Sequence, residues 1–238
     1  MTYAHQARAP APSWTPSYPS GVDPHSRHRG GRKLRRLAAV CGRFALGTFT
    51  FGEVASLLRA QPSPAVIERF RPSYNVAPTD EVLGATERND ERRMDLYRWG
   101  LVPSWSKDPR SGVRSINARA ETVRDKPLFR AAFEKRRLLI PASGYFEWQA
   151  TGRHKQPYYF TRRDGEPMIF AGLYEAWRAT NDDPWLLTCA IIVGPANEEG
   201  NDVHDRMPIV SQGSSASAPA QRPLHRREHR TRQRSTIT

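Results

Sequence analysis

The chain has 238 residues, a formal net charge of +13 and two cysteines, and 38% of its residues are hydrophobic. This length predicts one domain, alone or with tails. No stretch approaches the ~20 apolar residues of a membrane-spanning helix, so composition excludes one. A disulfide framework and a zinc site are excluded too, because two cysteines without a Cys/His cluster supply neither. We expect a reducing, cytoplasmic setting, with no cofactor, no metal and no membrane partner.

The positive charge is concentrated at the two ends of the chain. Residues 1–40 hold seven Lys and Arg against one acid, and residues 211–238 hold six against one, which leaves +2 for residues 41–210. High charge therefore argues only weakly for nucleic-acid binding. Both ends lack apolar periodicity, so we expect a disordered basic leader over 1–40 and a disordered basic tail over 211–238.

Each end also has a genetic interpretation. GUG can serve as a start codon, and it appears as valine when the gene is translated from an earlier start. Val40 is therefore interpreted as the true initiator, translated as Met, and we favour a chain that begins at Cys41 after the initiator is removed. A transit peptide or basic arm is the alternative for the leader. The tail is rich in Arg, Ala, Pro and Ser, as a frameshift in a GC-rich gene would produce, and the alternative is a genuine basic tail.

Residues 41–210 have the pattern of a mixed domain. Helical spacing predicts helices over Gly52–Ala60 and Pro127–Arg137. Short β-branched or aromatic runs separated by Gly, Pro, Asp or Asn predict strands. These are Arg43–Leu46, Met94–Leu101, Leu138–Ile140, Tyr145–Trp148, Tyr158–Thr161, Met168–Tyr174 and Leu186–Val193. Many short strands with few helices favour an α+β fold around a curled, barrel-like antiparallel sheet.

Cys41 is a candidate nucleophile if it is the first residue. Its α-amine and thiol would then have reference pKa values of about 7.7–8.0 and about 8.5, so both react near neutral pH. The amine condenses with an aldehyde to an imine, and the thiol closes on that imine to a five-membered thiazolidine. If it is internal, Cys41 simply opens a strand. Cys189 lies in an apolar run, which indicates a small buried hydrophobe.

Two further residues could transfer protons. His204 is followed by Asp205 and Arg206, which could orient its ring or bind an anion, although a lone loop histidine is more often structural. His154, in a polar turn, is expected at the surface. Glu147 is flanked by aromatic residues, and apolar surroundings would raise its pKa toward values useful for proton donation. The alternative for Glu147 is an outward-facing strand residue.

Two segments mix planar side chains with hydrogen-bond donors. Residues 99–105 contain Trp99 and Trp105, and residues 117–122 contain Asn117 and Arg119. Arginine and asparagine bind phosphates, and tryptophan stacks on bases, although most tryptophans belong to the core.

Taken in order, these motifs resemble the SRAP family, the SOS response-associated peptidases, understood as abasic site processing proteins. The motifs that carry the resemblance are Cys41–Phe44, Tyr74–Thr79, Arg98–Trp105, Asn117–Thr122, Arg137–Trp148 and His204–Pro208. The resemblance covers nearly all of residues 41–210. It implies a β-rich SRAP-like fold and a monomer whose partner is single-stranded DNA containing abasic sites.

The resemblance also implies roles for individual residues. Cys41 would form a thiazolidine cross-link with the ring-opened abasic site, and Asn117 would hold the sugar-derived portion. Glu147 would shuttle protons during imine formation and ring closure, and His204 would assist acid-base steps, including reversal. The residues implied in DNA binding are Arg43, Trp99, Arg119 and Arg206.

Two alternatives remain at the level of sequence. A thiol peptidase could cleave its own leader between Val40 and Cys41, with Cys41, Glu147 and His204 as catalytic residues. A non-catalytic nucleic-acid-binding protein could derive its affinity from the basic ends. The thiazolidine cross-link, in contrast to both alternatives, requires a free amine, because an uncleaved leader leaves an amide at Cys41 that cannot form the ring.

Overall fold

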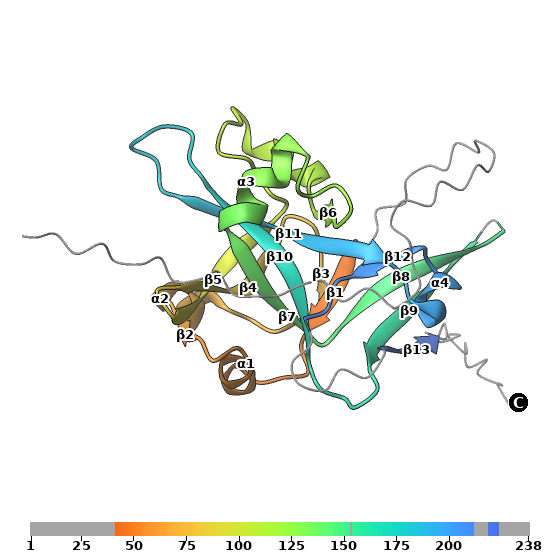
Figure 1. The fold of residues 1–238 in the computed structure, drawn as a ribbon. Coiled ribbons are helices and arrows are strands. Elements are labelled where there is room, and N and C mark those ends of the chain that lie inside the picture. Colours follow the sequence, from red (N-terminus) through yellow and green to blue (C-terminus); the bar gives the residue numbers. More distant parts are fainter. Residues whose placement is uncertain (1–40, 153, 212–218, 224–238) are drawn as a thin grey trace, which may run out of the picture.

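The computed structural model describes residues 41–152, 154–211 and 219–223 of the chain. The expected leader lies outside the described residues, as does most of the expected tail. The described part is an α+β fold in which two β-sheets are flanked by short helices (Figure 1). The predicted fold class is confirmed.

The larger sheet curls into a ring-like arrangement. Its strands follow the order β12-β11-β10-β7-β4-β5-β2, and β11 also pairs with β5, so the two ends of the path approach each other. The bounds are β2 Gln61–Pro62, β4 Glu81–Arg88, β5 Glu91–Trp99, β7 Arg137–Ala142, β10 Met168–Trp177, β11 Leu186–Pro195 and β12 Arg206–Pro208. A short strand, β6 (Asn117–Arg119), adds to β11.

The pairing within this sheet differs in one respect from the antiparallel sheet predicted. β11 pairs in parallel with β5 and β6, and β2 pairs in parallel with β5. The sheet is therefore mixed. Curling brings strands from distant parts of the chain side by side, and their direction is then set by the path of the chain rather than by a hairpin turn.

The smaller sheet is antiparallel, with the order β13-β9-β8-β1-β3. Its strands are β1 Arg43–Leu46, β3 Ser73–Val76, β8 Gly144–Thr151, β9 His154–Arg162 and β13 Pro219–Pro223. β13 falls within the segment expected to be a disordered tail, and it pairs with β9. These five residues complete an edge of the sheet, and the extent of the tail stays a prediction.

The helices are short and begin at recognisable caps. The Thr50 hydroxyl accepts a hydrogen bond from the Glu53 amide, and the Glu53 carboxylate accepts one from the Thr50 amide, a capping box at the start of α1. Ser63 caps the next helix, which begins with Pro64. The bounds are α1 Phe51–Leu58, α2 Pro64–Arg69, α3 Pro127–Lys135, α4 Glu198–Asn201 and a 3-10 helix, η1, over Pro109–Arg114. Both predicted helices are confirmed as α1 and α3.

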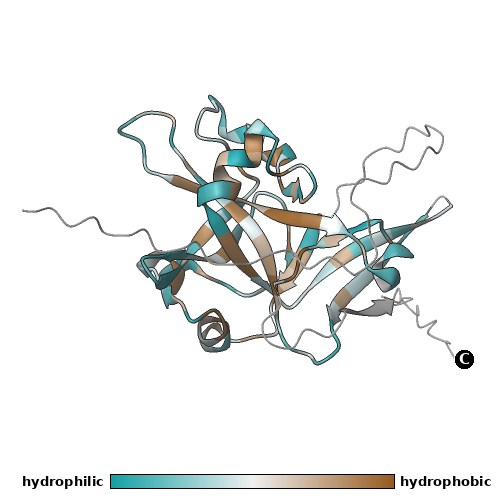
Figure 2. Ribbon diagram, viewed as in Figure 1, coloured by the Kyte–Doolittle hydropathy of each residue, from teal (hydrophilic) through white to brown (hydrophobic). Residues whose placement is uncertain are grey.

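Aromatic side chains fill the core between the two sheets. The Phe44 ring on β1 meets the Trp99 ring edge-on at 5.1 Å between centroids and the Phe170 ring at 5.9 Å. Figure 2 shows hydrophobic residues gathered on the central strands and hydrophilic ones on the loops and outer helix surfaces. Cys189 belongs to this core and is fully buried, as predicted.

Trp99 has no exposed surface, and its indole N–H donates to the Ile116 carbonyl at 2.9 Å. A side chain without accessible surface cannot stack on a base or contact a phosphate. The prediction that Trp99 binds DNA directly is therefore corrected: this residue packs the core and fixes the segment that contains Ile116, directly before Asn117.

Candidate functional site

The site is centred on Cys41 and Glu147, which come together because β1 pairs with β8. The register aligns Arg43 with Phe146 and Phe44 with Tyr145, so the start of β1 lies beside the middle of β8. The Cys41 backbone N–H donates to Glu147 Oε1 at 2.6 Å. Both residues are buried, and alternation along β8 turns Glu147 toward the interior together with Tyr145.

Burial controls the protonation of both groups. It raises the pKa of Glu147 to about 7, an effect that the hydrogen bonds from Cys41 partly offset and that nearby Asp205 increases. Near neutral pH this carboxyl group can therefore give or take a proton. Burial also raises the pKa of the Cys41 thiol well above its ordinary value, and Glu147 raises it further, so the isolated thiol stays protonated.

Tyr145 is a member of this site that the sequence analysis did not single out. Burial raises its pKa well above the ordinary value, with additional contributions from neighbouring Cys41 and Glu147. Its ring stacks on Phe160 at 4.9 Å between centroids. The alternation of residues 145–148 contained the signal, since Tyr145 and Glu147 occupy the same face of one strand.

His204 lies in the loop after α4, next to Asp205. His204 Nδ1 accepts from the Arg206 backbone N–H at 3.1 Å and lies 3.0 Å from Asp205 Oδ1. Nδ1 thus has a partner in each protonation state: the amide when it carries no proton, and the carboxylate when it does. Asp205 also lies close enough to Glu147 to influence the pKa of that group, which connects the loop to the Cys41–Glu147 pair.

Asn117 and Arg119 lie on β6, beside β11. The register aligns Asn117 with Ile191 and Arg119 with Val193. Ile191 belongs to the same core cluster as Cys41, whereas Arg119 is exposed. β11 therefore holds β6 at a fixed position along its length, with the amide oxygen of Asn117 buried and Arg119 in solvent.

The other two predicted arginines are held by specific partners. Arg43 donates to Asn75 Oδ1 at 3.0 Å across the β1–β3 pair. Arg206 forms an ion pair with Glu121, from the segment just after β6. These contacts fix the guanidinium groups while leaving further N–H donors on each.

Trp105, and not Trp99, is the tryptophan of this region that faces solvent, with 69% of its surface exposed. Its loop is anchored by hydrogen bonds on both sides: the Ser104 amide donates to Glu175 Oε2 at 3.2 Å, and the Trp177 indole donates to the Ser106 carbonyl at 2.7 Å. The signal in the sequence was the polar pair of serines around it, after Pro103, which is typical of an exposed turn.

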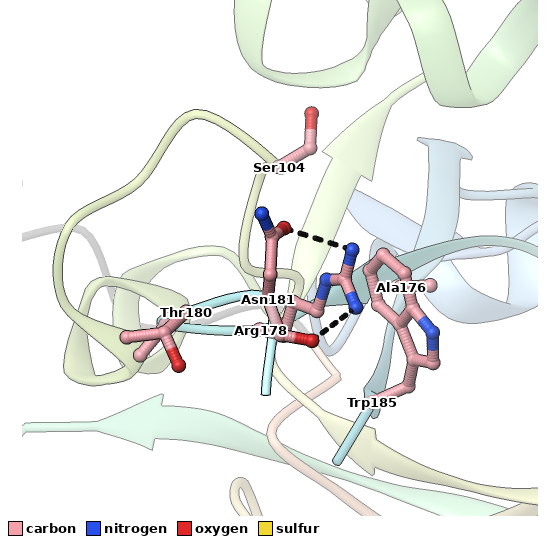
Figure 3. A pocket seen from close by; sticks show the side chains of 7 residues that line it. Ser104, Ala176, Arg178, Thr180, Asn181 and Trp185 are labelled. Atoms are coloured by element: carbon pink, nitrogen blue, oxygen red, sulfur yellow. Dashed lines mark hydrogen bonds between the residues drawn. The ribbon is translucent and has the colours of Figure 1, made fainter. Parts of the chain in front are cut away.

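A surface pocket of about 440 Å³ lies at the turn between β10 and β11 and is also lined by Ser104, next to Trp105. Figure 3 shows the Arg178 guanidinium against the Trp185 ring, 4.3 Å from its centroid, and bound by Asn181. None of the predicted site residues lines this pocket. His154 is exposed at the start of β9, as predicted, and takes no part in the site either.

The described residues show neither a metal centre nor a membrane span. No group of three or more His, Cys, Asp or Glu side chains gathers among them. In the same part of the chain, no helix combines the length and the apolar character needed to cross a bilayer.

Comparison with known proteins identifies the class to which this fold and site belong. The family described as SOS response associated peptidase (SRAP) matches residues 40–230, and the chain belongs to that family. The abasic site processing protein YoqW of Bacillus subtilis is 37% identical over 72% of this chain and 75% of its own length. The abasic site processing protein YedK of Escherichia coli is 33% identical over 74% of this chain and 78% of its own length.

A solved structure shares the fold. A Bacteroides thetaiotaomicron protein determined by X-ray crystallography superposes with a TM-score of 0.65 at 26% identity, covering 72% of this chain and 77% of the other. The family resemblance predicted from the ordered motifs is therefore confirmed.

Proposed function

We propose that this chain processes abasic sites in single-stranded DNA by forming a covalent thiazolidine link through Cys41. The observation that carries the proposal is the 2.6 Å contact between the Cys41 nitrogen and Glu147 Oε1, inside a buried site that raises the pKa of Glu147 to about 7. The names of the relatives support the same substrate.

The reaction begins when the Cys41 α-amine adds to the aldehyde carbon of the ring-opened abasic sugar. The resulting carbinolamine must lose its hydroxyl group. Protonated Glu147 donates a proton to that hydroxyl, water leaves, and the C=N bond of a protonated imine forms. This step leaves Glu147 as a carboxylate beside the cation.

Ring closure returns the proton. The Cys41 sulfur attacks the imine carbon, the electron pair of the C=N bond moves to nitrogen, and the thiol proton passes to the Glu147 carboxylate. The sum is aldehyde, amine and thiol giving a thiazolidine and one water. Because burial keeps the thiol protonated, a base at this position is what the sulfur needs in order to react.

The remaining predicted residues have positions that fit supporting roles. Asn117 would hold the sugar-derived portion, and His204 would exchange protons around the deoxyribose, including during release. Arg43, Arg119 and Arg206 would contact phosphates, and exposed Trp105 would stack on an unpaired base.

The backbone at Cys41 supports a chain that starts there. Its φ is 45°, a left-handed conformation that is unfavourable for a residue other than glycine. A chain that starts at Cys41 has no preceding peptide bond, so this constraint on φ disappears. Such a start also frees the α-amine that the reaction requires.

Two purified forms test the proposal, one beginning at Cys41 and one full length, each incubated with single-stranded DNA that carries one abasic site. We expect a denaturant-resistant shift, with an intact mass equal to protein plus DNA minus one water, from the form that begins at Cys41. Cys41→Ala should abolish the shift, while Cys189→Ala should leave it unchanged. A shift that survives Cys41→Ala would refute the thiazolidine.

Self-cleavage before Cys41 is a second candidate, and the same contact favours it. The amide nitrogen that donates to Glu147 is the leaving group of the bond between Val40 and Cys41, so protonated Glu147 could protonate it. The high pKa of the Cys41 thiol opposes a thiolate attack. Incubation of the full-length chain decides this: a mass loss of residues 1–40 that Glu147→Gln prevents would establish self-cleavage.

A further inference from the structure

The outer face of the smaller sheet carries a row of side chains of which the proposed function uses only Arg43. The strand registers place Arg43 on β1, Phe146 on β8 and Tyr159 on β9 directly opposite one another. The neighbouring row, Phe44, Tyr145 and Phe160, is buried, so alternation turns the first row outward. The Phe146 and Tyr159 rings meet at 4.6 Å between centroids.

Two glycines allow aromatic rings to lie against the backbone of this sheet. A Cβ at Gly144 would come within 2.6 Å of Tyr159 Cζ, and a Cβ at Gly47 would come within 2.8 Å of the Tyr74 ring. A side chain at either position would therefore displace the tyrosine ring, and at Gly144 it would also meet the Phe160 carbonyl oxygen, so these rings occupy the space that a side chain would take. The Tyr74 hydroxyl also contributes to raising the pKa of Tyr159, after burial, which places the two tyrosines near each other.

The row therefore forms an aromatic surface, defined by Tyr74, Phe146 and Tyr159, with one cation beside it. Tyr74 is 65% exposed, while Phe146 and Tyr159 are half-buried. Arg43 lies next to Phe146 and donates to Asn75. None of these five residues carries a negative charge.

We propose that this aromatic surface binds unpaired nucleotides of the DNA strand that flank the lesion. Bases stack on the exposed face of Tyr74 and on the edge of the neighbouring rings, and Arg43 contacts a phosphate between them. The inference rests on the proposed function, because Arg43 lies only two residues after Cys41 in the chain, so a strand held at Cys41 has this outer face of β1 within reach. Single-strand binding sites combine the same two elements, aromatic stacking and a cationic track.

The test measures binding separately from reaction. Full-length protein is titrated into labelled, undamaged single-stranded oligonucleotides of increasing length, and fluorescence anisotropy gives the dissociation constant. Tyr74→Ala should weaken binding at least about 5-fold, the range expected for losing one stacked base. Tyr74→Phe keeps the ring and should stay within about 2-fold of the unmodified protein. Ile67→Ala removes an equally exposed apolar side chain from α2 and serves as the matched control.

The outcomes distinguish this inference from the proposed reaction. If Tyr74→Ala binds undamaged DNA as tightly as the unmodified chain, the aromatic surface is not a DNA site. If it instead alters the oligomeric state in sedimentation, the surface is a protein interface and the inference is overturned. If the form that begins at Cys41 does not cross-link abasic DNA but binding still depends on the Tyr74 ring, the inference stands and the thiazolidine mechanism fails.

Phe146→Leu provides a second variant that keeps apolar volume. We expect it to weaken DNA binding while the thermal unfolding midpoint stays within a few degrees of the unmodified protein. Equal losses of stability and affinity would instead assign Phe146 to packing alone.

Discussion

Glu147 accepts a hydrogen bond from the backbone nitrogen of Cys41, a residue 106 positions earlier in the chain. The contact joins the first strand of the smaller sheet to the middle of β8. It places one titratable group beside both the nitrogen and the sulfur of the same residue. Proton transfer to and from either atom then requires no movement of the backbone.

Glu147→Gln should slow cross-linking by about 100-fold, because the amide keeps the size and the hydrogen bond but cannot donate a proton to the leaving hydroxyl. The measurement is the rate of cross-link formation at saturating abasic DNA, with the form beginning at Cys41. Glu53→Gln, on exposed α1, is the control. Equal rates for Glu147→Gln and the unmodified protein would exclude Glu147 as the acid.

The raised pKa of Glu147 predicts how stability changes with pH. In the full-length chain the folded state holds this proton up to about pH 7, whereas the unfolded carboxyl releases it near 4.5. The folded state therefore binds more protons between these values, and stability contributed by this group falls as pH rises from about 4.5 to 7, by about 3 kcal/mol at most. Urea unfolding across this range should show a flatter profile for Glu147→Gln.

In a chain that starts at Cys41, the pKa of Glu147 should be raised less than in the full-length chain. The new α-ammonium group lies within hydrogen-bond distance of Glu147 and favours its charged form, which lowers the pKa of the carboxyl group. Carbon-13 NMR titration of the labelled Glu147 carboxyl in both forms measures this. A midpoint that is the same in the two forms would show that the amine and the carboxylate are not in contact.

Arg119 is exposed on β6, so it can contact a DNA phosphate only if the strand passes over β6. Arg119→Ala should weaken binding to all single strands alike and reduce the slope of log affinity against log salt by ~0.7, the contribution of one phosphate contact. Arg93→Ala, on β5, serves as a control because its side chain is 77% exposed and pairs only with neighbouring Glu91 among the ion pairs of the described residues. An unchanged slope for Arg119→Ala would remove this residue from the DNA path.

Trp99 and Trp105 should behave in opposite ways. Trp99→Phe leaves a cavity and removes one of the two hydrogen bonds that the Ile116 carbonyl accepts, the other coming from the Ile191 N–H, so we expect a loss of about 1–3 kcal/mol in the free energy of unfolding. Trp105→Ala should change stability by less than about 0.5 kcal/mol and weaken DNA binding. Chemical denaturation and anisotropy titration of both variants separate the two effects. A stable Trp99→Phe protein with impaired binding would contradict the packing role.

The strands that local pattern predicted include those with three or more consecutive apolar or aromatic residues, such as Phe44–Leu46 in β1 and Met168–Ala171 in β10. β4 was missed because Gly84 interrupts it and charged residues close its ends. The structure explains the glycine: the Leu138 side chain of β7 fills the space where its Cβ would be, at 2.8 Å. That contact joins segments 54 residues apart, which no local pattern can encode.

The candidate site likewise combines residues that the sequence predicts with contacts that it does not predict. Chemistry identified Cys41 and Glu147 as candidates, since an aldehyde-capturing cysteine and a carboxylate among aromatics are recognisable by type. Their contact, and the pairing of Arg206 with Glu121, depend on strand registers between distant segments. Exposure also depends on tertiary packing, so two tryptophans six residues apart, Trp99 and Trp105, could not be told apart by composition alone.

The order of synthesis gives the β1–β8 pairing a further consequence. Cys41 leaves the ribosome long before Glu147, which follows 106 residues later. At 5–20 residues per second, the peptide bond before Cys41 stays accessible for roughly 5 to 20 s of translation. An enzyme that trims the nascent chain has open access during that interval, and folding then buries the bond. A residue left in place at that moment would block the amine unless the folded chain cleaves the bond itself.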